Sequence, residues 1–488
     1  MLATALFSLL VALPVMAPED FPGDPLATLS RTLADPVDSQ AALVALQATR
    51  DKGLAPLFVA LCRSEEPARR RFALDAVVQL LGGEAADTLR ERLQKDKSKS
   101  IRIAAMTHLI ELQAMDPQEI RLLLGSNDEE IQSLAAGALA ALGQGQSVLG
   151  LLTSLARSDN LAISNAAKLA LVRLGYHEHL RSLQRVISDE ATIELVVLRL
   201  LEQIEDEGIA AASDLAKRAT TAGRSVRVRM AAWRALCQAD PSAATLLYDA
   251  ISQTDHTVLS VRLLRLLSDC VGGKAKLGSL SRRQDSVGKL ARFELARRQG
   301  GGPASEAIAA ALACPHPIVV EYVLARAAED VESGPSSAEF YVPALLSFIK
   351  SYKLTSDQIR PEHYQLATAS TILADLGTTE AMAGLKMLLA GRYSANVRAV
   401  AAGLLRSKNK GVCELASGIL DSPYSELSSD AALVLCSFGD VAGVPKLRAL
   451  AFQSDKQVTS VQTMACWYLL KTAGRSKLAA AKLAAQVR

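Results

Sequence analysis

The sequence is poor in aromatic residues: Phe, Trp and Tyr make up 4% of its 488 residues, although half of the chain is hydrophobic. The apolar half is therefore mostly Ala, Leu and Val, a composition typical of helices that pack closely in thin layers. Long apolar runs are also missing. Because a membrane-spanning helix needs about 20 apolar residues, a protein with several membrane spans is excluded.

Neither sign of charge is in large excess. The chain has 54 Lys and Arg against 51 Asp and Glu, a formal net charge of +3. This balance excludes a disordered chain of like charges and a strongly basic nucleic-acid-binding protein. The seven cysteines include no Cys-x-x-Cys pair, and three of them (Cys237, Cys436 and Cys466) fall in expected helices, where a free cysteine behaves as a small apolar residue. A disulfide framework is not expected.

The first residues have the composition of a secretory signal. Residues 2–15 form an uncharged apolar run, and Val15-Met16-Ala17 supplies small residues where a signal peptidase requires them. Two features depart from this pattern: no Lys or Arg precedes the run, and Pro18 would directly follow the cut. The alternative is an N-terminal helix packed on the first repeat of a cytoplasmic protein. We predict cleavage after Ala17 and export to the periplasm or envelope of a bacterium.

A repeat of about 31 residues runs through the rest of the chain. Residues 101–109, 131–139 and 163–171 share an aliphatic residue, then Ala four positions later, then Leu after four more. Spacing by four places these side chains on one helical stripe, and the small central residue lets a neighbouring helix approach closely. Leu stands four positions after the central residue in 12 of 14 repeats. We call the central residues anchors: Ala42, Ala73, Ala105, Ala135, Ala167, Val197, Ala232, Leu263, Ala291, Val323, Ala369, Ala401, Ala431 and Ala465.

A second apolar segment precedes each anchor helix, for example at 85–93 and 148–155, and a polar turn such as 158–160 joins the two. Ser, Asp and Asn in these turns can cap the anchor helix. In four repeats glycine follows the anchor by eight positions, where a helix end favours a left-handed residue (Gly143, Gly175, Gly377 and Gly439). A hairpin with one apolar stripe per helix buries the stripe only by stacking on similar hairpins. The pattern predicts an all-α fold, an α-solenoid of about 14 stacked helical hairpins.

Residues 26–488 resemble the HEAT-repeat family, in particular the short bacterial repeats first described in phycobilisome bilin lyases. The family's Val-Arg pair before the Ala and Leu positions is matched by Ile101-Arg102, Val228-Arg229 and Val397-Arg398. Other repeats lack the arginine, so the polar ladder of some HEAT proteins is incomplete here (Gln132, Ser164, Glu194, Ser260 and Gly288). The resemblance implies the solenoid fold but no single activity, because this fold serves many tasks.

The spacing of the anchors breaks between Val323 and Ala369, which lie 46 residues apart. A Gly/Pro/Ser segment here precedes several aromatic residues, the type that anchors protein interfaces. The alternative is that these larger side chains fill a local change in curvature. We predict that Phe340, Tyr341 and Tyr352 are at least partly exposed and contact a protein partner. The expected organisation is a signal peptide at 1–17, a Pro-rich acidic linker at 18–29, about ten repeats at 30–330, an irregular insertion at 331–362, and about four repeats with a basic C-terminal cap at 363–488.

Basic residues cluster in two stretches of the sequence. Residues 217–234 hold six Lys and Arg with no acidic residue among them, and residues 274–298 hold eight, offset by two acidic residues. In neighbouring repeats they can form one positive stripe for an acidic protein, an anionic polymer or a nucleic acid. The alternative is a set of solvated helix faces. From the second stretch we take four residues as candidate partner contacts: Arg282, Arg283, Arg297 and Arg298.

Motifs for catalysis or cofactor binding are few. His177-Glu178-His179 is the one histidine cluster, and two histidines two positions apart on a helix point to opposite sides, so they cannot share a metal. Gly272-Gly273-Lys274 lacks the rest of a phosphate-binding loop and is expected to be a turn between helices. We predict a non-catalytic HEAT-repeat scaffold for protein–protein interaction in the cell envelope, with no cofactor, no metal and no nucleic-acid partner. Two alternatives remain: a binder of nucleic acid or anionic polymer through basic helix faces, and a HEAT-type enzyme resembling a lyase.

Overall fold

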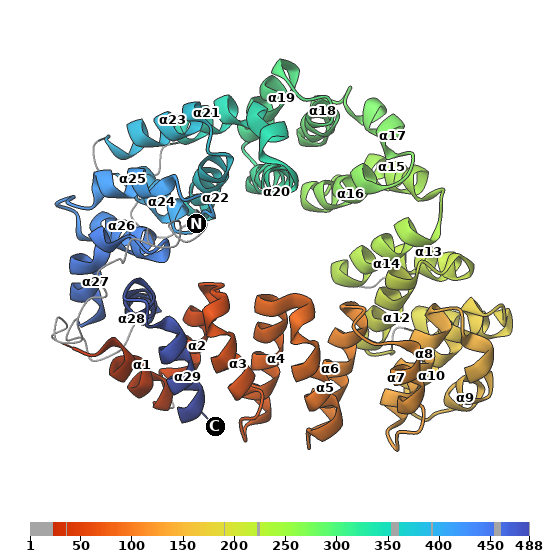
Figure 1. Ribbon diagram of the computed structural model, residues 1–488. Coiled ribbons are helices and arrows are strands. Elements are labelled where there is room, and N and C mark those ends of the chain that lie inside the picture. Colours follow the sequence, from red (N-terminus) through yellow and green to blue (C-terminus); the bar gives the residue numbers. More distant parts are fainter. Residues whose placement is uncertain are drawn as a thin grey trace, which may run out of the picture. The chain divides into compact units, whose positions relative to one another are not determined.

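The computed structural model describes residues 23–35, 37–189, 191–221, 225–352, 361–391, 394–452 and 460–487, so the predicted signal peptide lies outside the described residues. Within these ranges the secondary structure is helical throughout, and no strand is found (Figure 1). The chain divides into two compact units. Unit 1 comprises Met1–Ile101 and Tyr352–Arg488, and unit 2 comprises Arg102–Ser351. No helix in the described part of the chain is both long and apolar enough to cross a membrane.

The helices of unit 1 come from both ends of the sequence. They are α1 (Pro25–Ala34), α2 (Ser39–Ala48), α3 (Ala55–Leu61), α4 (Pro67–Leu81), α5 (Ala86–Lys95), α22 (Pro361–Leu376), α23 (Thr379–Leu389), α24 (Ala395–Leu404), α25 (Val412–Ile419), α26 (Ser425–Ser437), α27 (Val444–Ala451), α28 (Ser460–Thr472) and α29 (Ser476–Gln486).

The helices of unit 2 are consecutive in sequence, and the first of them begins just before the boundary. They are α6 (Lys99–Glu111), α7 (Pro117–Leu123), α8 (Glu129–Ala141), α9 (Leu149–Leu155), α10 (Leu161–Arg173), α11 (Leu180–Ser188), α12 (Glu194–Glu207), α13 (Ser213–Thr221), α14 (Val226–Ala239), α15 (Ala243–Gln253), α16 (Thr257–Asp269), α17 (Gly273–Leu280), α18 (Ser286–Arg297), α19 (Gly302–Leu312), α20 (Pro317–Ser333) and α21 (Val342–Ser351).

The even-numbered helices from α2 to α28 contain the fourteen anchors, and all fourteen anchor side chains are buried. The residue four positions after the anchor is also buried in every repeat except two, where Leu295 and Leu405 are half-buried. Odd-numbered helices alternate with these, and consecutive helices such as α3 and α4 or α13 and α14 pack as hairpins. The predicted all-α solenoid of about 14 hairpins is therefore confirmed.

The predicted helix ends are present as well. Gly143, Gly175, Gly377 and Gly439 have φ values of 76°, 96°, 63° and 82°, in the left-handed region that lets the chain leave a helix without a clash. The Asn160 side chain accepts a hydrogen bond from the backbone N–H of Ala162 at 3.0 Å and so caps α10. These local features fix where each hairpin turns.

Two segments that the sequence predicted to be linker or turn are partly helical. α1 begins at Pro25 with Asp24 as its cap, so residues 25–29 of the segment expected to be a linker are helical. Gly272 lies in the expected turn between helices, with φ at 78°, but Gly273 and Lys274 already belong to α17. A Cβ atom added to Gly273 would lie 1.8 Å from the carbonyl oxygen of Leu267, so only glycine fits at this close approach.

The first and last helices of the chain pack against each other within unit 1. α28 contacts α1 and α2, and α29 contacts α3 (Figure 1). The Trp467 indole on α28 is completely buried and donates a hydrogen bond to the Asp51 carboxylate at 3.1 Å, and Lys471 forms an ion pair with the same carboxylate at 3.1 Å. Repeats from opposite ends of the sequence are therefore in direct contact within unit 1.

Candidate protein-binding surfaces

The aromatic residues of the insertion differ in exposure. Phe340 and Tyr352 are half-buried, as predicted, but the prediction that Tyr341 is partly exposed is wrong. The Tyr341 ring is fully buried, and its hydroxyl donates a hydrogen bond to Asp330 on α20 at 2.7 Å. The rings of Phe340 and Tyr341 lie with their centres 4.6 Å apart. Tyr341 thus fills the core where the insertion meets α20, since a large ring is needed to occupy that space.

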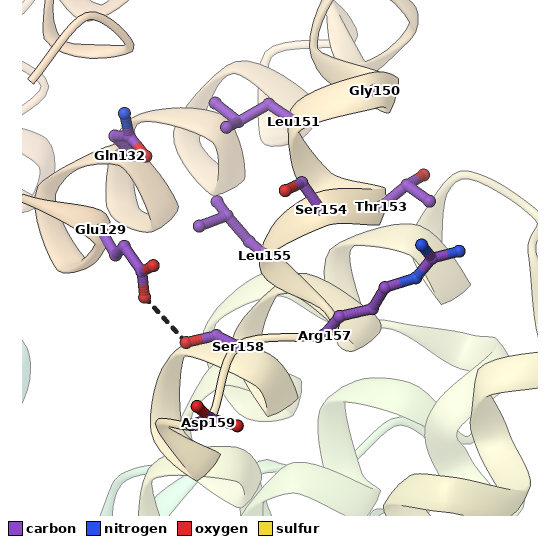
Figure 2. Close-up of a pocket in the computed structure, with 10 residues that line it drawn as sticks. All are labelled: Glu129, Gln132, Gly150, Leu151, Thr153, Ser154, Leu155, Arg157, Ser158 and Asp159. Atoms are coloured by element: carbon purple, nitrogen blue, oxygen red, sulfur yellow. Dashed lines mark hydrogen bonds between the residues drawn. The ribbon is translucent and has the colours of Figure 1, made fainter.

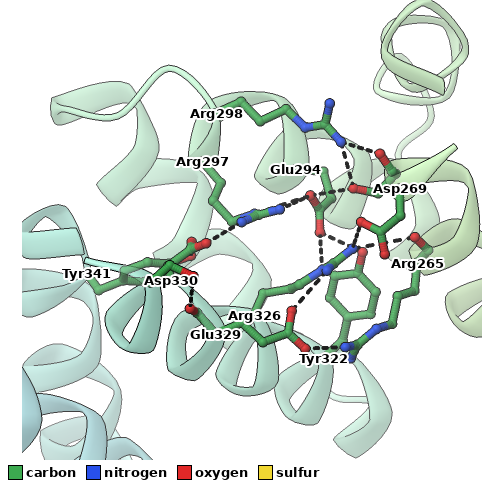
Figure 3. A network of polar contacts seen from close by, with 12 residues as sticks. Arg265, Asp269, Glu294, Arg297, Arg298, Tyr322, Arg326, Glu329, Asp330 and Tyr341 are labelled. Carbon is green, nitrogen blue, oxygen red and sulfur yellow. Dashed lines mark hydrogen bonds and ion pairs between the residues drawn. The ribbon is translucent and has the colours of Figure 1, made fainter. Parts of the chain in front are cut away.

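A network of polar contacts surrounds Glu294 on α18 (Figure 3). The Glu294 carboxylate is completely buried, and both of its oxygens are fully engaged. One oxygen accepts hydrogen bonds from the Tyr322 hydroxyl at 2.6 Å and from Arg326 at 3.0 Å. The other accepts from the Ser268 hydroxyl at 2.8 Å and from Arg297 at 3.0 Å. These donors come from α16, α18 and α20, so the network ties three successive even-numbered helices together.

The Glu294 carboxylate is held in its charged form. Burial on its own would raise the pKa of Glu294, but the charges of Arg326 and Arg297 and the hydrogen bonds from Tyr322 and Ser268 lower it below the ordinary value for glutamate. An ionised carboxylate whose oxygens are all occupied is not a proton donor and has no free lone pair for a substrate. This cluster therefore serves packing rather than catalysis.

The four predicted basic contacts are in different surroundings. Arg297 is half-buried and bridges Glu294 to Asp330, at 2.5 Å from the latter, so the structure brings it together with Tyr341 inside the fold. Arg298 donates hydrogen bonds to the backbone carbonyl and hydroxyl of Ser268. Arg283 pairs with Asp285 in its own turn at 2.5 Å. Arg282 is exposed and belongs to no described ion pair. These four arginines therefore do not form one free positive stripe.

A polar hollow of about 570 Å³ lies along α8 and α9 of unit 2 (Figure 2). In Figure 2 a single hydrogen bond links the labelled side chains, from the Ser158 hydroxyl to Glu129 at 2.8 Å, and the Arg157 side chain extends away from this pair. The bond connects the turn before α10 to the first turn of α8 and so holds neighbouring repeats together. The lining residues are Glu129, Gln132, Gly150, Leu151, Thr153, Ser154, Leu155, Arg157, Ser158 and Asp159.

A second hollow, of about 490 Å³, lies on α12, α14 and α16 of unit 2, and we call it the α12–α16 groove. α14 packs against both of the other helices. On α14 the lining residues Arg227, Met230 and Arg234 recur every three or four positions, so they share a stripe beside the buried one that contains the anchor Ala232. The full lining is Leu198, Glu202, Val226, Arg227, Met230, Ala231, Arg234 and Arg262.

Two arginines of the α12–α16 groove have no ionic partner. Arg234 is held by Glu205 on α12, with N–O distances of 2.9 and 3.1 Å. Within the part of the chain that the structure describes, Arg227 and Arg262 form no ion pair and no side-chain hydrogen bond, and both are exposed. The lining contains one carboxylate, Glu202, against these two free guanidinium groups. The groove therefore offers uncompensated positive charge.

Aliphatic side chains border the same surface. Leu195, Val226 and Val258 lie in the first turns of α12, α14 and α16, and their exposed fractions are 53%, 43% and 37%. Leu195 precedes the lining residue Leu198 by three positions and Val258 precedes Arg262 by four, so each pair shares one face of its helix. Three successive even-numbered helices therefore present an exposed aliphatic residue at the same end, beside the arginines.

Arg227 and Arg234 belong to the first basic stretch of the sequence. Arg262 lies outside both basic stretches, and a pattern of charge does not identify the exposed aliphatic residues. Arg262 stands between apolar residues of α16. The aligned repeats carry a signal for one lining residue only: the position two residues after the anchor is arginine in three successive repeats, Arg199, Arg234 and Arg265, and of these Arg234 lines the groove.

No protein-family model matches the sequence, and no curated protein matches it. Among solved structures, the chain is similar to the karyopherin Kap121p bound to the extreme C-terminus of the protein phosphatase Cdc14p, with a TM-score of 0.36 and 11% identity over 92% of this chain and 57% of that one. For Kap121p bound to the SUMO protease Ulp1p, the TM-score is 0.36 and the identity 12%, over 92% of this chain and 57% of that one. For Kap95p with RanGDP, the TM-score is 0.31 and the identity 14%, over 92% of this chain and 66% of that one. The chain thus spans less than two thirds of these proteins.

The fold is an α-solenoid of stacked helical hairpins, the architecture that HEAT-repeat proteins have. This assignment rests on the repeated hairpins and their buried anchors. No three His, Cys, Asp or Glu side chains among the described residues lie close enough to hold a metal ion. Burial raises the pKa of the Cys62 and Cys436 thiols to about 12, so these thiols are protonated and poorly nucleophilic at neutral pH.

Proposed function

We propose that this HEAT solenoid is a non-catalytic scaffold that binds another protein through the α12–α16 groove. The observation that carries the proposal is the pair of free guanidinium groups, Arg227 and Arg262, beside the exposed aliphatic residues of three neighbouring helices. Arginine and aliphatic surface together provide charge and area for a protein contact. The helices that carry them are fixed by their buried anchors, so little conformational entropy is lost on binding.

Site-specific photo-crosslinking in the native cell tests this function. A benzophenone amino acid placed at Val226 or at Val258 is expected to capture the same protein, and Arg262→Glu is expected to abolish both adducts. The matched control is the same amino acid at Leu122 on α7, which is 81% exposed and belongs to the same unit. Adducts that form equally from Leu122, or that survive Arg262→Glu unchanged, would contradict the proposal.

The insertion supplies a second proposed contact with the partner. Phe340 retains exposed surface, and Arg282, in the same unit, is exposed without a described ion pair. Phe340→Ala is expected to weaken capture of the partner while changing the melting temperature by only a few degrees. Normal capture combined with a much lower melting temperature would show that the Phe340 ring fills the core instead.

We also propose that the protein acts in the periplasm or cell envelope. The support is the uncharged apolar run at 2–15 followed by Val15-Met16-Ala17. Protein purified from its native cell is then expected to begin at Pro18 and to fractionate outside the cytoplasm. An intact Met1 on cytoplasmic protein would overturn this localisation without affecting the binding proposal.

A further inference from the structure

We infer that the α12–α16 groove binds an acidic peptide segment with aliphatic side chains, in an extended conformation that crosses α12, α14 and α16. This inference rests on the proposed function and adds the chemistry of the partner. It follows from three properties of the groove: the charge that its arginines leave unpaired, the position of its aliphatic border, and the spacing of its helices.

The charge of the groove requires carboxylates on the occupant. Arg227 and Arg262 are exposed guanidinium groups on adjacent helices, and each can hold a carboxylate through two parallel hydrogen bonds. Arg234 is already paired with Glu205, so it lines the groove without adding free positive charge. Glu202 repels a lone carboxylate near it. An occupant with two carboxylates that reach Arg227 and Arg262 pairs both free guanidinium groups, provided that neither carboxylate lies against Glu202.

The aliphatic border sets the spacing of apolar residues on the occupant. Packed helices lie roughly 8–10 Å apart, and an extended chain of the polyproline II type rises about 3.1 Å per residue with three residues per turn, so every third side chain lies on one face. Adjacent helices of the groove are thus about three residues apart along a crossing peptide. Leu195, Val226 and Val258 therefore meet an apolar side chain at every third position, and the residues between them are free to present carboxylates to the arginines.

The lining favours a peptide over a nucleic acid. Proteins that bind single-stranded nucleic acids combine a track of cations with aromatic rings on which bases stack. None of the eight lining residues is aromatic, and Glu202 would face the phosphate backbone. The aliphatic border would also meet a charged sugar-phosphate chain without gaining buried apolar area. A polypeptide supplies carboxylates to pair with the arginines and aliphatic side chains to pack on the aliphatic border.

Fluorescence anisotropy with synthetic peptides and the full chain tests the inference. The probe is a fluorescein-labelled peptide with four repeats of Leu-Asp-Glu, and the comparison peptides have four repeats of Leu-Asn-Gln or of Ser-Asp-Glu. We expect the first peptide to bind at least tenfold more tightly than either of the others. The double variant Arg227→Ala/Arg262→Ala is expected to reduce its binding at least tenfold, and Val226→Ser/Val258→Ser several-fold.

The matched control is Arg157→Ala, which removes an exposed arginine of the same unit outside the groove and is expected to leave binding unchanged. Circular dichroism confirms that each variant is folded. Equal binding of the Leu-Asn-Gln peptide, unchanged binding by the double arginine variant, or tighter binding of a 12-nucleotide single strand would overturn the inference. If such a result accompanies arginine-dependent crosslinking from Val226 and Val258, the proposed function stands and only the acidic partner is refuted.

Discussion

Removal of the Trp467 indole is expected to loosen both ends of the chain at once. The ring is completely buried in unit 1 and packs near Gly53, where a Cβ atom would lie 3.6 Å from it. Replacing a buried Trp with Ala costs about 3–5 kcal/mol, because the cavity that remains collapses only in part. Since α28 contacts α1 and α2, we expect this loss to be shared between helices that stand far apart in the sequence.

The partner of the indole allows a second, smaller perturbation. The Asp51 carboxylate accepts hydrogen bonds from the Gly53 backbone at 2.9 Å and from Trp467 at 3.1 Å, and it pairs with Lys471. Burial tends to raise the pKa of Asp51, but the hydrogen bond from Gly53 and the interactions with Lys471 and Trp467 outweigh burial and lower it. Asp51→Ala leaves the buried indole N–H unpaired, which costs about 1–3 kcal/mol.

Hydrogen exchange with mass spectrometry measures both effects. Trp467→Ala is expected to reduce protection in α1–α3 together with α28 and α29, although Asp51 and Trp467 are 416 residues apart in sequence. The matched control is Trp233→Ala, which removes the other tryptophan, buried on α14 of unit 2, and should leave α1–α3 protected. Protection that falls only in α26–α29 after Trp467→Ala would refute the reasoning.

Four further outcomes follow from single residues. Leu139→Ala, at a completely buried position on α8, should lower the free energy of unfolding by about 2–5 kcal/mol and reduce hydrogen-exchange protection mainly in α7, α8 and α10. Uniform loss of protection along the chain would contradict this. Burial raises the pKa of Asp430 to about 6, so the native state binds more protons than the unfolded state, and the free energy of unfolding falls as pH rises from about 4 to about 6. Asp430→Asn should therefore stabilise the protein by up to about 3 kcal/mol at pH 7.5 and by little at pH 4. Urea unfolding at the two pH values measures the difference. A hydrogen bond from Cys237 lowers the pKa of Cys270, whereas burial raises the pKa of Cys466 to about 12. Iodoacetamide at pH 8 should therefore label Cys270 before Cys466. Equal labelling of the two cysteines would contradict this order. Tyr341→Phe should cost about 1–3 kcal/mol by leaving Asp330 without its hydroxyl donor, and an unchanged thermal transition would show that this bond contributes nothing.

The repeat pattern in the sequence predicted the fold because its signals are local. The four-residue spacing around Ala135 and Ala167 describes one helical stripe, and a stripe centred on small residues is buried wherever similar hairpins stack. Gly143 and Gly175 lie eight positions after these anchors and have the left-handed conformation expected there. None of these features depends on residues more than one repeat away.

The candidate surfaces were less predictable, because charge and exposure depend on which residues the fold brings close together. Arg297 and Arg227 both lie in basic stretches of the sequence. The first is held by Glu294 and Asp330 inside the fold, whereas the second has no partner within the described chain. Sequence composition does not distinguish them, since Asp330, which completes the pairing of Arg297, comes from another helix.

The sequence by itself determined the hairpins, their buried stripes and the turns between them, because each depends on the spacing of residues within about 31 positions. Only the tertiary structure decided that Tyr341 is core, that Asp51 meets Trp467, and that Arg262 lies beside Arg227 in one groove. Asp51 and Trp467 pair across 416 residues, and no periodic pattern encodes which repeats meet at such a distance. Complementary shape and charge determine this contact, here a buried indole and a carboxylate that accepts a hydrogen bond from its N–H, and such surfaces exist only after the repeats have stacked.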